Sequence, residues 1–282
     1  MSTTPLINSL TKRHLEDYLT QPSSVLLLTG AKGAGKKYLA LLAGGRLLGA
    51  PSDGLINKGR LLVLPAGAGI DDVRQIIKEV SIKAASTRAV IINEADKLGH
   101  EAQNALLKTL EELPPRTFFI LTSSSPNSLL ATIRSRAQTV VVKPLTLTET
   151  KAAFRNLPLA DTERAWLLGE GLAAQLNALL VSESPQLKTA AESAKEFLGL
   201  DSYNRIIFLD KNIADRDGLI LFLSGLKRIL KAASLLNAQK GNSSALNRLT
   251  ASRRLVVELT DKANSNSSTK LINLQLATSL KV

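Results

Sequence analysis

Residues 88–142 decide the fold, and they read RAVIINEADKLGHEAQNALLKTLEELPPRTFFILTSSSPNSLLATIRSRAQTVVV. Two apolar runs, Arg88–Asn93 and Thr117–Leu121, are rich in β-branched and aromatic residues, which is typical of strands buried on both faces. Polar residues follow, at Asn93–Asp96 and at Thr122–Ser125. Ligands of an open α/β sheet lie beyond the carboxyl ends of its strands, so the two polar turns predict one shared site.

Upstream, Ser24–Thr29 predicts a buried strand that leads directly into a glycine-rich loop and then into a helix from about Lys37 to Leu48. Gly-x-x-x-x-Gly-Lys in this context indicates a phosphate-binding loop. Glycines let backbone N–H groups converge on an anion, and the helix N-terminus adds its positive end. Lys36 would reach the terminal phosphates. The candidate phosphate-binding residues are Gly30, Gly33, Gly35, Lys36 and Lys37.

Two positions depart from the pattern of a nucleotide hydrolase. Lys37 stands where a Ser or Thr hydroxyl would ligate Mg²⁺, and Asn93 stands where an aspartate would hold the same ion beside Glu94. An ammonium group cannot ligate a metal, and a neutral amide is a poor substitute for a carboxylate. The sequence therefore predicts a site that has lost magnesium-dependent hydrolysis and holds no metal. ATP, ADP or phosphate bound without productive Mg²⁺, or no ligand at all, stay open as alternatives.

The rest of the chain alternates helix and strand patterns and then becomes helical. Helices are expected at 8–21 and 70–84 and a strand at 61–64, which predicts a mostly parallel sheet. Apolar spacing at 186–282 is helical throughout and predicts a bundle, and Trp166 is expected in the core. We expect three domains: an α/β nucleotide-binding-like domain at 1–144, a small helical lid at 145–184 and a helical C-terminal domain at 185–282.

The 282-residue chain has no cysteine, which excludes disulfides, a cysteine-ligated zinc site and a thiol nucleophile. Residues 1–24 lack the apolar segment of a signal peptide, and no run approaches the roughly 18 apolar residues of a membrane helix. A cytoplasmic protein is expected. The net charge of +12 favours a nearby polyanion such as nucleic acid, although solubility explains it equally well. Because aromatic residues are few, contact with DNA should run through backbone phosphates.

Three motifs together resemble the AAA+ subunits of sliding-clamp loaders. They are Asn93–Leu98, the run QNALLKTLEE at Gln103–Glu112, and IRSR at Ile133–Arg136. The likeness covers residues 1–142 well and the remainder only in outline. It implies an AAA+ fold with a parallel five-stranded sheet flanked by helices. A small helical lid and an all-helical collar, through which subunits form a ring, would follow.

The resemblance also implies roles for single residues. In that family a Ser-Arg-Cys motif carries an arginine finger that reaches the nucleotide of the neighbouring subunit; here Arg136 is kept and Ala137 replaces the cysteine. Ser124, or alternatively Ser123, would occupy the sensor position at the end of the fourth strand. Gln175 would stand where a second-sensor arginine touches the γ-phosphate. The zinc module that many relatives carry is lacking near residues 50–58.

With these departures the chain resembles the δ′ subunits of bacterial DNA polymerase III clamp loaders. Such subunits typically cannot hydrolyse ATP, yet they supply an arginine finger in trans. The resemblance implies no independent catalysis by this chain. Its partners would be γ/τ-like and δ-like subunits in a hetero-oligomeric ring, the sliding clamp and primed DNA. Two alternatives stay open. One is an active γ/τ-type ATPase, which needs Lys37 and Asn93 to be tolerated; the other is a basic DNA-binding scaffold with an inert AAA+ domain.

Overall fold

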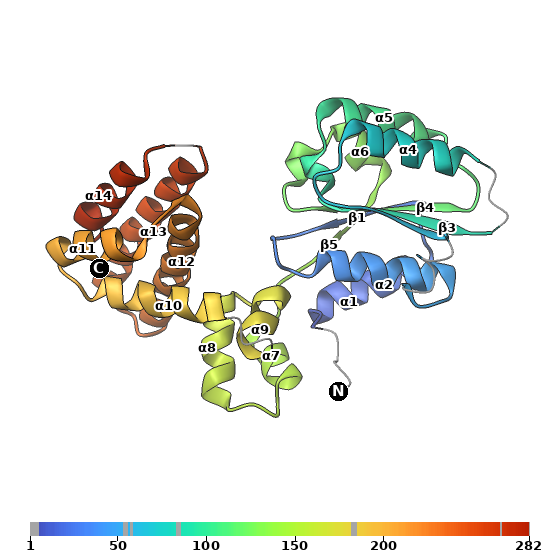
Figure 1. Ribbon diagram of the computed structural model, residues 1–282. Helices are drawn as coiled ribbons and strands as arrows, with labels where there is room; N and C mark the ends of the chain where they lie inside the picture. Colours follow the sequence, from blue (N-terminus) through green and yellow to red (C-terminus); the bar gives the residue numbers. More distant parts are fainter. Residues whose placement is uncertain are drawn as a thin grey trace. The chain divides into compact units, whose positions relative to one another are not determined.

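The computed structural model of the chain describes residues 6–52, 56, 59–82, 86–181, 185–265 and 267–281. The chain forms two compact units (Figure 1). Unit 1 comprises residues 1–153 and 172–174, and unit 2 comprises residues 154–171 and 175–282. The three-domain division predicted from the sequence stays a prediction. Among the described residues, no helix combines the length and the apolar character that crossing a bilayer requires.

Unit 1 is a five-stranded parallel sheet with helices on both faces (Figure 1). The strand order is β2-β3-β4-β1-β5, and every neighbouring pair is parallel, which confirms the predicted fold class. The elements, with η1 and η2 as short 3₁₀ turns, are α1 Ser9–Thr20, β1 Val25–Thr29, α2 Lys36–Leu48, β2 Leu61–Leu64, α4 Ile70–Ser81, β3 Arg88–Ile92, η1 Ala95–Lys97, α5 His100–Glu111, β4 Thr117–Ser123, η2 Pro126–Ser128, α6 Ala131–Arg136, β5 Gln138–Val141 and α7 Leu147–Ala153.

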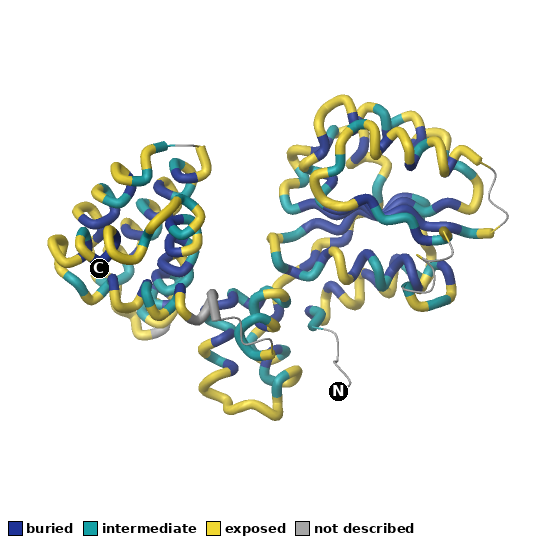
Figure 2. The backbone as a smooth tube through the Cα atoms, in the orientation of Figure 1, coloured by how far each residue is buried: buried dark blue, intermediate teal, exposed yellow. Residues whose placement is uncertain are grey.

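Two apolar cores cover the two faces of this sheet. Side chains of a strand alternate between faces, so Val25 and Leu27 pack with α4, α5 and α6, while Leu26 and Leu28 pack with α1 and α2. All five residues of β1 and of β3 are buried, as Figure 2 shows in dark blue. The continuous apolar runs of the sequence follow from this burial on both faces.

Unit 2 is helical, as the apolar spacing predicted. Its core includes Phe197, Phe208 and Phe222, whose ring centroids lie 5.2–5.9 Å apart. The expectation that Trp166 lies in the core is wrong, because it lies at the edge of the buried face of α8, beside Thr162 and Gly169, and is only half-buried. The helices are α8 Leu159–Gly169, α9 Ala173–Leu180 (whose first two residues belong to unit 1), α10 Pro185–Leu198, α11 Ser202–Asn212, α12 Arg216–Gln239, α13 Ser243–Asn264 and α14 Thr269–Ser279.

Candidate functional site

The glycine-rich loop lies between β1 and α2, where the motif predicted it. Gly30, Gly33 and Gly35 all have positive φ, of 150°, 87° and 96°. A Cβ on Gly30 would lie 2.4 Å from the carbonyl oxygen of Val142, so that position excludes any side chain. Gly35 is the residue before the first turn of α2. The loop thus needs its glycines for backbone conformation and for its close approach to the end of β5.

The ammonium group of Lys36 is bound by the loop itself. It donates to the carbonyl oxygens of Gly30 and Ala31 at 2.6 and 2.9 Å and to Ser124 Oγ at 2.9 Å. These bonds use all three donors of an ammonium group. Burial lowers the pKa of Lys36 from its ordinary value, although Asp96 and Glu94 act in the opposite direction. Lys36 therefore joins the glycine loop to Ser124 at the end of β4, and its contact with phosphate stays a prediction.

The acidic turn after β3 lies against the polar turn after β4. The carboxylate of Asp96 accepts hydrogen bonds from the backbone N–H groups of Ser124 and Ser125, at 3.3 and 3.0 Å. The N–H of Glu94, a residue in the left-handed region, donates to Thr122 Oγ1 at 2.9 Å. The two turns that the sequence placed at neighbouring strand ends are therefore in direct contact. The carboxylate of Glu94 pairs with Lys97 at 2.5 Å.

Asn93 is 5% exposed, and its side-chain oxygen has no hydrogen-bond partner. Its amide nitrogen lies 3.4 Å from the carbonyl oxygen of Leu64. An unpaired buried acceptor costs about 1–3 kcal/mol, because it has lost water without gaining a donor. Asn93 therefore offers an unused acceptor at the end of β3.

Residues of the glycine loop, the end of β3 and Thr122 of β4 line one cavity of about 290 Å³ in unit 1. Its charged and amide side chains are Lys32, Lys36, Lys37, Asn93 and Glu94. The donor set does not suit Mg²⁺, which requires oxygen ligands with at least one free carboxylate. Glu94 is already paired, and no cluster of three acidic or histidine side chains that could hold a metal occurs in the described part of the chain. The arrangement suits an anion instead.

Arg136 is the last residue of α6 and lies at the surface of unit 1. Its Nη2 donates to Glu111 Oε1 at 2.7 Å, and its Nη1 donates to the carbonyl oxygen of Thr132 at 2.9 Å. The side chain of Arg136 is still 34% exposed. Arg134, on the same helix, donates to Asn127 Oδ1 at 3.3 Å. Arg136 is thus a partly exposed guanidinium that two neighbours hold in place.

The two sensor-like residues lie in different units. Ser124 belongs to unit 1 and contacts Lys36, as described above. Gln175 belongs to unit 2, and its side-chain oxygen is buried without a hydrogen-bond partner. The residue before it, Ala174, lines the cavity and donates its N–H to the carbonyl oxygen of Gly33 at 3.0 Å. The sensor roles of Ser124 and Gln175 stay predictions.

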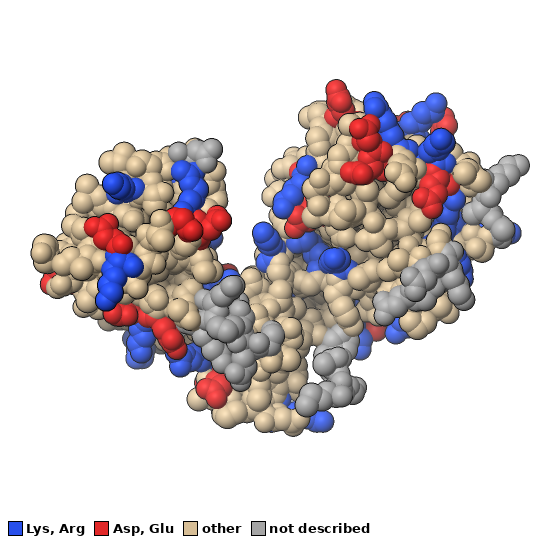
Figure 3. Space-filling model, viewed as in Figure 1, with Lys and Arg blue, Asp and Glu red and all other residues tan. Residues whose placement is uncertain are grey.

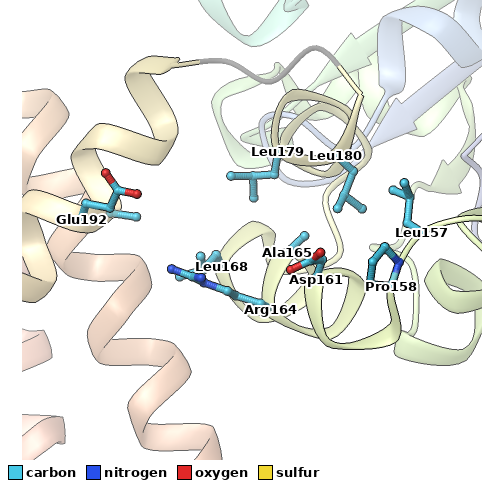
Figure 4. A pocket seen from close by; sticks show the side chains of 10 residues that line it. Leu157, Pro158, Asp161, Arg164, Ala165, Leu168, Leu179, Leu180 and Glu192 are labelled. Carbon is cyan, nitrogen blue, oxygen red and sulfur yellow. The ribbon is translucent and has the colours of Figure 1, made fainter.

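Unit 2 contains a cavity of its own, of about 250 Å³ (Figure 4). Leucines from α8 and α9, including Leu168, Leu179 and Leu180, form its apolar part. The charged side chains that border it are Asp161, Arg164 and Glu192. It holds no nucleophile next to a base and no converging acids, so its lining indicates no reaction.

Sequence reasoning missed two residues that the structure places at or beside these sites. Glu111 holds Arg136, and Lys32 adds a third lysine to the cavity. Lys32 had a signal, because it lies inside the glycine loop. Glu111 had none, because its partner Arg136 lies 25 residues away along the chain.

The sheet order, the phosphate-loop motif after β1 and the helical C-terminal part define the fold of an AAA+ protein. Across 97% of its length the chain superimposes on all of a DNA polymerase III gamma subunit-related protein from Thermotoga maritima, with a TM-score of 0.53 and 18% identity. At that identity the likeness concerns the fold alone.

Sequence comparison is more specific. Residues 63–146 match the family described as "DNA polymerase III, delta subunit". The DNA polymerase III subunit delta′ of Haemophilus influenzae is 47% identical over 72 residues, which are 25% of this chain and 22% of that protein. Subunit tau of Bacillus subtilis is 40% identical over 80 residues, 28% of this chain and 14% of that protein. The matched segment thus spans about a fifth or less of these relatives. The chain is similar to clamp-loader AAA+ subunits, as its motifs predicted.

Proposed function

We propose that this chain is a δ′-like subunit of a bacterial DNA polymerase III clamp loader and supplies Arg136 to ATP bound by an adjacent subunit. The observation that carries the proposal is Arg136 itself. It lies inside the segment that matches the family, and its guanidinium is partly exposed at the end of α6. A guanidinium in this setting can stabilise the charge that develops on a transferred phosphoryl group.

The chain's own nucleotide site would not hydrolyse ATP. Support comes from the cavity beside the glycine loop, where Lys37 and Asn93 replace metal ligands and Glu94 is paired with Lys97. The chain would contribute to hydrolysis by placing Arg136 beside the ATP of an adjacent subunit, and not by hydrolysing ATP itself. Its helical unit 2 would join a hetero-oligomeric ring with γ/τ-like and δ-like subunits in the cytoplasm, and the ring would load a sliding clamp onto primed DNA.

The decisive experiment reconstitutes the clamp loader with Arg136→Ala and compares clamp- and DNA-stimulated ATP hydrolysis with the natural complex. Arginine fingers supplied in trans raise the rate of hydrolysis by about 10³–10⁵. ATP turnover at the adjacent subunit's site should therefore nearly vanish, while assembly of the complex is unchanged. Arg134→Ala is the matched control, because Arg134 lies on the same helix but bonds Asn127 and not Glu111. Equal ATPase and clamp loading by the Arg136→Ala and natural complexes would refute the proposal.

The similarity to subunit tau of Bacillus subtilis favours a second candidate, an active γ/τ-type ATPase. That candidate requires magnesium-dependent ATP hydrolysis by this chain or its homo-oligomer. The remaining alternative, a basic DNA-binding scaffold with an inert AAA+ domain, requires affinity for DNA that falls steeply with salt. It also requires that the complex work without Arg136. On the face drawn in Figure 3, basic and acidic side chains are intermixed over each unit, which gives the scaffold no particular support.

A further inference from the structure

The cavity beside the glycine loop has a use that the proposed role of Arg136 does not require. Lys32, Lys36 and Lys37 line it together, and Glu94, paired with Lys97, is the acidic residue in its lining. The first turn of α2 also directs its N-terminal end toward this loop. Cations and a helix N-terminus favour an anion with several charges.

Asn93 supplies a second, independent observation. Its side chain is 5% exposed, it lines the cavity, and its oxygen has no donor. This oxygen needs an N–H or O–H group to offset its loss of water. Lys37 lines the same cavity and is exposed, and its ammonium group has no hydrogen-bond or ion-pair partner among the described residues. An ammonium group on a flexible four-carbon stem is the kind of donor that the Asn93 oxygen lacks.

The two substitutions also conserve charge as a pair. In a hydrolytic site the charges of Mg²⁺, a neutral hydroxyl and an aspartate add up to about +1. Here the ammonium of Lys37 and the neutral amide of Asn93 also add up to about +1, without a metal ion. Either substitution alone would shift the local charge by one unit. Together they replace a bound cation by a covalently attached one.

We propose that this cavity binds the polyphosphate chain of a nucleotide without a divalent metal, and that the Lys37 ammonium takes the place that magnesium holds in a hydrolytic site. Lys37 would contact both the phosphate oxygens and Asn93 Oδ1. Lys36, now bound to the carbonyl oxygens of Gly30 and Ala31, would exchange these acceptors for phosphate oxygens. Binding without hydrolysis would follow, because no metal polarises an attacking water.

Titration calorimetry with the purified chain tests this, with ATP, tripolyphosphate and adenosine as probes, each in EDTA and in excess magnesium. We expect ATP and tripolyphosphate to bind in EDTA and adenosine not to bind. Magnesium should leave the affinity for ATP unchanged or weaken it, because the metal neutralises the charges that Lys37 would contact. Tighter binding in magnesium, or no binding of ATP by the folded chain, would overturn the proposal.

Two variants make the test specific to Lys37. Lys37→Thr should weaken binding in EDTA by roughly tenfold, the loss of one charge-assisted hydrogen bond. The double variant Lys37→Thr/Asn93→Asp should bind ATP more tightly in magnesium than in EDTA. Lys108→Thr, an exposed lysine on α5, is the matched control and should change nothing. Equal affinities of Lys37→Thr and the natural chain would refute the role of Lys37. Such a result would leave the Arg136 proposal intact, because Arg136 acts on a neighbour's nucleotide.

Discussion

At the scale of the residue, Arg136 is a surface side chain whose freedom two neighbours restrict. A free arginine loses rotamer entropy when it meets a phosphate, at a cost of about 2 kcal/mol. Here Glu111 and the carbonyl oxygen of Thr132 already restrict the guanidinium. Its remaining N–H groups stay available, because the side chain is still 34% exposed. If Arg136 serves a neighbour's ATP, Glu111 is a positioning residue for it.

Glu111→Gln should therefore lower kcat of the reconstituted complex by up to about fivefold, the value of an exposed ion pair, with little change in KM for ATP. Stability of the chain should change by less than about 0.5 kcal/mol. Glu112→Gln, at the next residue, which is also exposed, is the control. Indistinguishable kinetics for the two variants would remove Glu111 from the proposed mechanism while leaving Arg136 in it.

At the scale of the element, unit 2 depends on a close approach of two helices. A Cβ built on Gly225 of α12 would lie 2.5 Å from the carbonyl oxygen of Ala190 on α10. Backbone lies on the opposing side, so no side-chain rotation could relieve this contact. The glycine inside a 24-residue helix is thus explained by packing, although glycine weakens helices by about 1 kcal/mol relative to alanine.

Gly225→Ala tests which of these two effects is larger. We expect a net loss of up to about 2 kcal/mol in the free energy of unfolding, because an overpacking cost of about 1–3 kcal/mol is offset by a gain in helix propensity of only about 1 kcal/mol. Urea unfolding followed by circular dichroism measures it. Lys227→Ala, two residues further along α12 and exposed, should stay within about 0.5 kcal/mol. A stabilised Gly225→Ala variant would mean that α10 can move aside at no cost.

At the scale of the whole molecule, contacts between residues far apart in sequence close unit 1. Glu149 accepts hydrogen bonds from the backbone N–H groups of Ser9 and Thr146, both at 2.7 Å, and from the side chain of Asn8 at 3.0 Å. Burial alone would raise the pKa of Glu149, but these bonds outweigh it and lower the pKa to about 2. The carboxylate thus ties the start of α1 to α7, about 140 positions along the chain.

This carboxylate should make unit 1 sensitive to acid. Because the folded pKa lies below the unfolded value of 4.5, the stabilisation is fully present above about pH 5 and is lost as pH falls toward 2. Glu149→Gln should cost about 1–2 kcal/mol at pH 7, a value reduced for partial solvent exposure. Urea unfolding at pH 7 and pH 3 should show this difference shrinking at the lower pH. A difference of equal size at both pH values would contradict the assignment.

Local patterns were sufficient to predict much of the fold and part of the site. The strands β1, β3 and β4, the glycine loop and the helix α2 were all predicted from the sequence, because β propensity, apolar runs and positive-φ glycines act over a few residues. The meeting of the turns after β3 and β4 was also predictable, since parallel strands end at one edge of a sheet. The half-burial of Trp166 was not predictable, because the position of the edge of the buried face of α8 depends on how the helix packs against its neighbours.

The sequence by itself determined the AAA+ fold, the phosphate loop and the departures at Lys37 and Asn93, since these rest on residue identity and short spacing. Only the tertiary structure decided which groups those residues meet. It joins Lys36 to Ser124, leaves the Asn93 oxygen unpaired and pairs Arg136 with Glu111. The physical reason is that hydrogen bonds and ion pairs act over about 3 Å between side chains that the chain brings together from 25 or more positions apart.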